Sequence, residues 1–472
     1  MNPSFKQRLD SLEPLLGNDA SGIISALGIV EYLENSEAQL LEAMYLSHIG
    51  TWPTPPPPST QGSLMFGLVP YWLHHPPDFI QNYVTQHKVL NLLWTALKVV
   101  VPTRLTQANY EALKSSVNDS NGGLVGPDGT IYTDSEYDQL DPEWLWAVLD
   151  YLVVTIGKDR APFGACPQTV TLTGSTPNQV RIAVVGDWGT GIYADNPAVQ
   201  VMTQINQQAP DYIIHLGDVY YAGTDGDFPP IGEEVNNYLD LWPSTATQKA
   251  GTSFMLNSNH EMYSGAKGYF AALGDERFQA QHGASYFALQ YGEWTILGLD
   301  SAYYDTSAMF MDGSITKGDP NRTQPNWVSK LGLTPSKTIV MTHHNGLSYD
   351  GTVQGALWTE INQALGGDPG AWYWGHVHNG IAYTSPTVGN SNTVARCVGH
   401  GAFPFANAWG MDEAKPIRYE YYAHTPNSNP KETPRVLNGF MMMTISSTGQ
   451  ITEEWYEQGN PVSVFTKTYS LS

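Results

Sequence analysis

The sequence predicts an α/β protein in which a mainly helical region precedes a larger domain of sheets and helices. From residue 180 onward, short apolar runs rich in Val and Ile alternate with polar turns and helical segments, a pattern typical of βαβ units. Before residue 160, apolar residues recur at helical spacing instead. Several apolar runs of the second region are followed at once by carboxylate, amide or imidazole side chains. A length of 472 residues also favours more than one core.

Residues 1–160 are expected to form a mainly helical domain. Apolar spacing predicts helices before residue 50 and again over 77–101, and the proline run at 55–58 predicts an extended segment. Asp141 and Pro142 open a strongly apolar helix that contains Trp144. We interpret its aromatic residues as core and not as a cofactor site, so no chemistry is assigned to this domain. Residues 161–179 are rich in Gly, Pro and Thr, and this composition predicts a linker.

Composition excludes several classes of partner. The chain has 45 acidic and 22 basic residues, and the resulting formal charge of −23 opposes binding to nucleic acid. No apolar stretch is long enough to span a bilayer, and the first residues lack the apolar segment of a signal peptide. We therefore expect no nucleic-acid or membrane partner and a cytoplasmic location, with an exported form left open. The two cysteines, Cys166 and Cys397, cannot form a disulfide framework.

The second region opens with a predicted βαβ unit. Its strands are expected at 181–185 and 212–216, joined by a helix near 198–208. Asp187 and Asp218 lie just past the carboxyl ends of these strands, which is where open α/β sheets place their ligand sites. The glycine-rich turn at 186–191 could instead cradle a pyrophosphate. Its spacing is not G-x-G-x-x-G, however, and Asp187 within the turn would repel phosphate.

Polar side chains follow each of five apolar runs in this region. Taken singly, each has an ordinary explanation, because an Asp after a strand is often a helix cap and a lone His is often a core residue. Together, at corresponding strand ends, they are difficult to explain as caps and predict a metal site. The residues are Asp187; Asp218 with Tyr220 and Tyr221; Asn259, His260 and Glu261; His343 and His344; and His376 and His378.

The order and spacing of these residues resemble those of the calcineurin-like metallophosphoesterases, and within them the purple acid phosphatases. Gly189 stands where most of the superfamily has a metal-binding His, and Tyr221 follows Asp218 by three residues. In the purple acid phosphatases, a tyrosine at this position replaces that histidine. The resemblance covers residues 180–472, and it implies a four-layer αββα sandwich as the catalytic domain.

The resemblance also implies two metal ions bridged by Asp218. One would be held by Asp187, Asp218, Tyr221 and His378, and the other by Asp218, Asn259, His343 and His376. Carboxylate and phenolate oxygens suit Fe(III), whereas imidazole and amide ligands suit a divalent Fe, Zn or Mn ion. Family spacing favours Tyr221 over Tyr220 and His343 over His344, and leaves His344 free to contact substrate. Ser258 replaces the glycine of the family's G-N-H motif, so either the turn differs or the serine is mildly strained.

The implied function is hydrolysis of a small phosphate ester, most simply a phosphomonoester, by in-line attack of a hydroxide held by the metals. His260 would protonate the leaving group, or alternatively only orient a ligand. The alternatives are a phosphodiesterase or nucleotidase on the same centre, and a non-catalytic metal-binding interaction protein. Loops at 225–242, 302–323 and 406–437 are candidates for setting specificity. The sequence does not indicate an oligomeric state.

Overall fold

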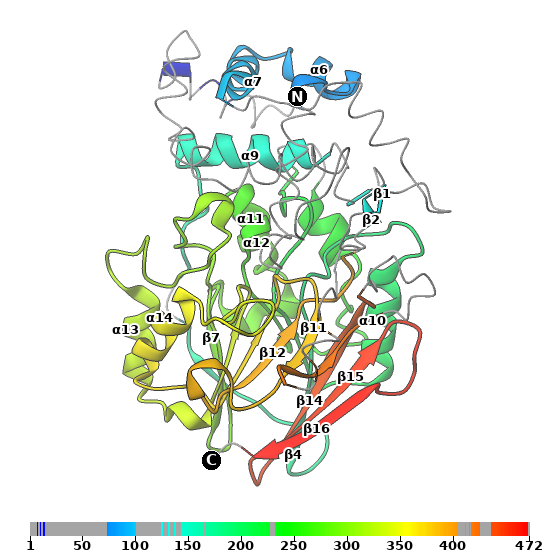
Figure 1. The fold of residues 1–472 in the computed structure, drawn as a ribbon, viewed down its shortest axis with the longest axis vertical. Coiled ribbons are helices and arrows are strands. Elements are labelled where there is room, and N and C mark those ends of the chain that lie inside the picture. The colour runs from blue at the N-terminus through cyan, green and yellow to red at the C-terminus, as the bar shows by residue number, and fades with distance from the viewer. Residues whose placement is uncertain are drawn as a thin grey trace.

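The computed structural model describes residues 7, 10, 13–14, 73–100, 124–125, 131–132, 136–137, 143–164, 167–226, 232–403, 411, 415, 417–424 and 436–470 (Figure 1). Most of the helices expected before residue 50, the proline segment, Cys166 and residues 406–410 lie outside this set. Among the described residues, no helix combines the length and the apolar character needed to cross a bilayer.

One sheet has six strands and contains the predicted βαβ unit. Strands β4, β5 and β6 run parallel, and α10 (Pro197–Gln207) connects the first two. The closing strands of the chain extend this sheet antiparallel from β4. In spatial order the strands are β16 (Phe465–Ser470), β15 (Gln450–Glu457), β14 (Gly439–Ser446), β4 (Gln179–Val185), β5 (Tyr212–His215) and β6 (Ser253–Met255).

The second sheet has eight strands, of which β8, β9, β10 and β12 are parallel. Its edge strand β3 lies inside the stretch expected to be a linker and pairs with β7. In spatial order the strands are β13 (Tyr419–Tyr422), β11 (Gly380–Tyr383), β12 (Val394–Val398), β10 (Ala371–Trp374), β9 (Thr338–Thr342), β8 (Trp294–Gly298), β7 (Phe287–Tyr291) and β3 (Thr169–Thr171).

The two sheets pack face to face, and helices cover their outer faces. One apolar core joins alternate residues of β4, β5 and β14 to residues of β7, β9 and β10. A second core lies between the six-stranded sheet and α10, α11 (Asn259–Tyr263) and α12 (Lys267–Ala272). The third lies between the eight-stranded sheet and α13 (Thr323–Leu331) and α14 (Ala356–Leu365). The predicted α/β sandwich is therefore confirmed.

Short elements complete the described chain. A two-stranded sheet precedes α9, and short helical turns lie in the loops between the larger elements. They are β1 (Leu124–Val125), β2 (Ile131–Tyr132), η2 (Glu234–Leu239), η3 (Glu276–Gln281), η4 (Ala308–Phe310), η5 (Pro335–Lys337) and η6 (Val388–Asn390).

Helix α9 (Trp144–Gly157) belongs to two cores at once. Its residues Leu145, Leu149 and Leu152 join an apolar cluster with α6 (Asp78–Val84) and α7 (Lys88–Val100). Trp144 and Ala147 join the core of the six-stranded sheet instead. Figure 1 shows α9 between these two helices and α11, and α9 packs against α11. The expected boundary at residue 160 thus follows a helix that already contacts the sandwich.

Candidate metal centre

The polar residues predicted at the strand ends come together where the parallel strands of both sheets end. Asp187 and Asp218 follow β4 and β5, and Asn259 begins α11 after β6. His343 follows β9, and His376 and His378 follow β10. Backbone hydrogen bonds connect the two sheets at this edge, among them Gly186 N–H to the carbonyl of Val398 at 2.9 Å. The structure thus brings together every predicted metal ligand except Tyr221.

Asp187 is fully buried and lies beside the His-x-His segment. Its carboxylate accepts a hydrogen bond from the backbone N–H of His376 at 2.9 Å, and its Oδ1 lies 3.4 Å from His378 Nε2. Gly375 makes the close approach possible, because a Cβ atom there would lie 2.5 Å from Asp187 Oδ2. Burial, and then the neighbouring charge of Asp218, raise the pKa of the Asp187 carboxyl. Two neighbouring buried carboxylates need a positive partner to be charged together.

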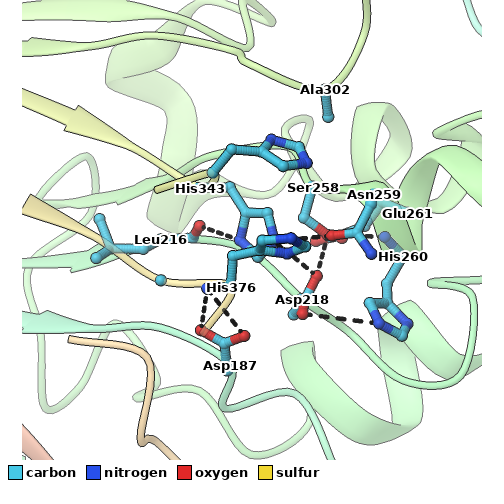
Figure 2. Close-up of polar contacts among 12 residues, drawn as sticks. Asp187, Leu216, Asp218, Ser258, Asn259, His260, Glu261, Ala302, His343 and His376 are labelled. Atoms are coloured by element: carbon cyan, nitrogen blue, oxygen red, sulfur yellow. Dashed lines mark hydrogen bonds and ion pairs between the residues drawn. The ribbon is translucent and has the colours of Figure 1, made fainter. Parts of the chain in front are cut away.

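Asp218 occupies the middle of the site (Figure 2). Its Oδ1 accepts a hydrogen bond from the Ser258 hydroxyl at 2.5 Å and lies 3.2 Å from His343 Nε2. Its Oδ2 lies 3.8 Å from both His260 Nε2 and His378 Nε2. Burial opposes its charge, yet the surrounding imidazoles hold the pKa of Asp218 well below its usual value. Asp218 is therefore positioned between the two predicted ligand sets.

The hydrogen bonds of His343 show why a cation fits here. Its Nδ1 faces the carbonyl of Leu216 at 3.0 Å, and since a carbonyl only accepts, Nδ1 carries the ring proton. Burial lowers the pKa of His343 to about 3, so the ring is neutral and Nε2 presents a lone pair. That lone pair faces Asn259 Oδ1 at 2.8 Å and His376 Nδ1 at 3.2 Å. Asn259 in turn donates its amide to Tyr263, which directs Oδ1 inward.

His343 Nε2 and Asn259 Oδ1 both present lone pairs, so neither can donate a hydrogen bond to the other. Lone pairs that converge in this way favour a metal ion between them. The ligand atoms of Asp187, Asp218 and His343 lie within 4.8 Å of one another, as do those of His343, His344 and His376. Of the ligands, His376 and His378 are partly exposed, whereas Asp187, Asp218, Asn259 and His343 are buried.

The structure places Tyr220 beside the carboxylates, whereas the sequence favoured Tyr221. The Tyr220 hydroxyl donates to Asp218 Oδ2 at 2.9 Å and lies 3.1 Å from His378 Nε2. The Tyr221 hydroxyl accepts the backbone N–H of Tyr137 at 3.2 Å instead, and its ring packs against Trp144. Spacing from Asp218 was the basis of the prediction. Tyr221 instead contacts residues far earlier in the chain.

Burial, followed by the charges of Asp218 and Asp187, raises the pKa of the Tyr220 hydroxyl well above its usual value. Without a cation this phenol therefore remains a hydrogen-bond donor. A trivalent ion beside it would favour the phenolate, in the way that a coordinated thiol loses its proton.

Ser258 replaces the family glycine without strain. Its φ of −131° and ψ of 178° are extended, and its Oγ caps α11 by accepting the N–H of His260. The same oxygen lies between Asp218 Oδ1 and Glu261 Oε2. A serine has one hydroxyl proton, which can serve only one of the two carboxylates. Burial, and then Asp218, raise the pKa of Glu261 to about 8, which is consistent with a protonated Glu261. Sequence reasoning did not anticipate this use of Ser258.

His260 and His344 flank the centre in different ways. His260 Nδ1 lies 2.7 Å from the carbonyl of Tyr221 and must donate to it, so Nε2 faces Asp218. Burial lowers the pKa of His260. Both nitrogens of His344 are occupied, one by the Ser301 hydroxyl at 2.8 Å and the other by the carbonyl of Phe310 at 2.7 Å. His344 therefore supports the loop at 302–323 and has no free nitrogen for a substrate.

That loop also reaches the ligands directly. Met311 Sδ lies 3.6 Å from Asn259 Nδ2 and 3.8 Å from the Tyr263 hydroxyl. The expectation that this insertion lies near the strand ends agrees with these contacts. No sequence signal distinguished Met311 from the other apolar residues of the loop.

A known protein family matches the part of the sequence that carries these residues. The calcineurin-like phosphoesterase family matches residues 180–380. No curated protein sequence matches the chain significantly.

Similar solved structures include GAP50, the anchor in the inner membrane complex of Plasmodium, at 13% identity and a TM-score of 0.41, covering 62% of this chain and 89% of that one. A purple acid phosphatase, PPD1 from yellow lupin (Lupinus luteus) seeds, has 14% identity and a TM-score of 0.36 and covers 62% and 54%. Vacuolar protein sorting 29 from Cryptosporidium parvum has 12% identity and a TM-score of 0.27 and covers 62% and 98%.

The matched residues contain both carboxylates, the asparagine and the histidines of the site. The superfamily inferred from the motifs is therefore confirmed, and it supports a metal-dependent phosphoesterase. Residues 180–380 of this chain belong to the calcineurin-like metallophosphoesterases.

Proposed function

We propose that the chain is a dinuclear metal-dependent hydrolase of small phosphomonoesters. The observation that supports this proposal most directly is the position of Asp218. One of its oxygens contacts Tyr220, with His378 nearby, and the other contacts His343. A carboxylate with ligand sets on both sides is suited to bridge two metal ions.

One ion would be held by Asp187, Asp218, Tyr220 and His378, with Tyr220 in the place first expected for Tyr221. The other would be held by Asp218, Asn259, His343 and His376. The first set is rich in hard anionic oxygens and suits Fe(III), and the second suits a divalent Fe, Zn or Mn ion. When bound, the two ions would activate water and neutralise charge on the phosphoryl oxygens.

The side chains around the ions would complete the chemistry. His260 donates from Nδ1 to the carbonyl of Tyr221 at 2.7 Å, so any proton that it transfers comes from Nε2. This nitrogen lies at the Asp218 side of the site, where it can protonate the leaving alkoxide. Asn259, oriented by Tyr263, would keep its amide oxygen toward the second ion.

Leaving groups of different acidity test the role of His260. If it is the acid, His260→Ala should slow alkyl phosphates by about 10²–10⁴-fold and activated aryl phosphates far less, because the latter leave without a proton. Equal slowing of both substrates would indicate that His260 only orients a ligand.

The function itself is tested with metal-loaded protein, an aryl phosphomonoester and an aryl phosphodiester, assayed across pH beside Asp218→Asn. We expect faster monoester hydrolysis, and loss of both activity and the second bound metal in the variant. Faster diester hydrolysis would reassign the substrate class. No hydrolysis of either ester by protein with two bound metals would contradict the proposal and favour a metal-binding role without catalysis.

A further inference from the structure

Helix α9 places one of its faces on the metal centre. Trp144, Ala147 and Tyr151 lie at helical spacing, so they share one side of the helix. Trp144 and Ala147 belong to the core of the sandwich, and the Tyr151 ring lies 6.2 Å from Tyr263 and 5.5 Å from Phe310. The opposite side, with Leu145 and Leu149, packs on α6 and α7. The helix thus connects the N-terminal segment to the site.

Trp144 packs on Tyr221 and lies near the rings of Tyr220 and His260. Its ring lies 4.7 Å from that of Tyr221 at an interplanar angle of 82°, and 6.3 Å from Tyr220 at 88°. It also lies 5.8 Å from the imidazole of His260. The indole is 3% exposed, and such edge-to-face packing fixes the direction of the neighbouring rings.

A second residue of the N-terminal segment holds the same turn. Tyr137 donates its backbone N–H to the Tyr221 hydroxyl at 3.2 Å, and its ring lies 4.7 Å from that of Tyr221. Asn237 donates its amide to the Tyr137 hydroxyl at 3.2 Å and to the carbonyl of Tyr220 at 2.7 Å. Tyr221 is therefore held away from the carboxylates, while Tyr220 is held toward them.

We propose that Trp144 is a positioning residue of the metal centre, so that the segment before the phosphoesterase domain is part of the active site. Trp144 holds Tyr221 in its packing site, and this orients the Tyr220 hydroxyl and His260 Nε2 toward Asp218. This inference rests on the proposed function. Ordinary core packing is the competing explanation, because a buried tryptophan stabilises a fold without any effect on a particular site.

Trp146 provides the matched control. It lies on the same helix, but its ring packs against Tyr83 at 5.2 Å, in the N-terminal cluster. Trp146→Ala therefore removes the same side chain from α9 on the side away from the metal ligands. Both variants loosen the segment, and only Trp144→Ala also removes a contact with Tyr221 and His260.

The measurements are the tyrosinate–Fe(III) absorption band, Zn²⁺ or Mn²⁺ affinity by calorimetry, and kcat and KM on an aryl phosphomonoester. For Trp144→Ala we expect a shifted or weakened band and an affinity and kcat about 10–100-fold lower, as for other residues that orient metal ligands. KM should change little, and Trp144→Phe should restore the wild-type values to within about threefold, because it keeps an aromatic edge at this position.

Equal effects of Trp144→Ala and Trp146→Ala, or a wild-type band and affinity in Trp144→Ala, would overturn the proposal. Failure of the proposed function is a separate result. It would appear as wild-type protein that binds metal but hydrolyses neither ester, and the band and affinity comparison would still test Trp144.

Discussion

The adjacent residues Tyr220 and Tyr221 have opposite surroundings, and replacing each by Phe should separate their roles. Tyr220→Phe removes a hydroxyl that lies 2.9 Å from Asp218 and 3.1 Å from His378. Its ring would remain packed between His260 and Phe403, each at 4.5 Å. Tyr221→Phe removes a hydroxyl whose hydrogen bond is to the backbone of Tyr137.

The two variants should therefore fail in different ways. Tyr220→Phe should lose the tyrosinate–Fe(III) colour and bind iron at least about 10–100-fold more weakly, since even residues that only orient ligands have effects of that size. Its fold should be retained because the ring packing is unchanged. Tyr221→Phe should keep the colour and lose about 1 kcal/mol of unfolding free energy, the usual net contribution of a hydrogen bond.

Visible absorption during iron titration and urea unfolding of each variant measure the two effects. Colour lost in Tyr221→Phe but kept in Tyr220→Phe would refute the placement of the rings and restore the residue favoured by family spacing. Colour kept in both variants would exclude a tyrosine ligand from this turn.

Three further predictions concern stability. Arg396 and Glu453 form a buried ion pair between the two sheets, with Nε to Oε2 at 2.7 Å. Glu453→Gln should therefore cost about 3–5 kcal/mol in urea unfolding, and the double variant Arg396→Met, Glu453→Leu should recover most of it. A double variant as unstable as Glu453→Gln would contradict this explanation.

His400 is buried against Trp455, and neither ring nitrogen has a hydrogen-bond partner among the described residues. Burial lowers its pKa to about 3, so the unfolded chain binds a proton below about pH 6.5 that the folded chain does not. The resulting stability is complete above pH 6.5 and is lost as the pH falls toward 3. When the pH is lowered from 7.5 to 5, the free energy of unfolding of His400→Asn, measured in urea, should fall by about 2 kcal/mol less than that of the wild type. An equal fall in both proteins would refute the contribution of His400 to the pH dependence. Chelation should destabilise the wild type by about 2.7 kcal/mol per site relative to protein at a free metal concentration of 100 Kd, and thermal unfolding of Asp218→Asn should respond much less.

The strands, and the polar residues that follow them, could be predicted because both depend on local sequence. The apolar runs that became β4, β5, β6, β9 and β10 are continuous, and a polar residue after each marks the strand end. The edge strand Thr169–Thr171 was not predicted because it lacks such an apolar run. Its exposed positions carry threonine, so no apolar run distinguishes it from a linker.

Features set by distant contacts could not be predicted in this way. Spacing from Asp218 says how far along the chain a phenol lies, but the direction of the ring depends on its neighbours. Those neighbours, Tyr137 and Trp144, precede the turn by more than 70 residues and belong to a region with no recognisable motif. Ser258 is a comparable case, because its value to Asp218 follows from the cap that it forms on α11.

The backbone of the site explains why distant packing matters so much here. Asp187, Asp218, His376 and His378 all have positive φ, from 50° to 76°, a conformation that costs a non-glycine residue about 1–2 kcal/mol. Local sequence opposes these conformations, so the surrounding structure must maintain them. The N–H of Asp187 donates to the carbonyl of Gly217, and the N–H of His376 donates to Asp187 itself, each at 2.9 Å. These four candidate ligands are thus held in place by the protein itself, and the packing of the two sheets supplies the stability that this costs. Loss of packing at α9 should therefore affect the ligands sooner than it affects the sheets.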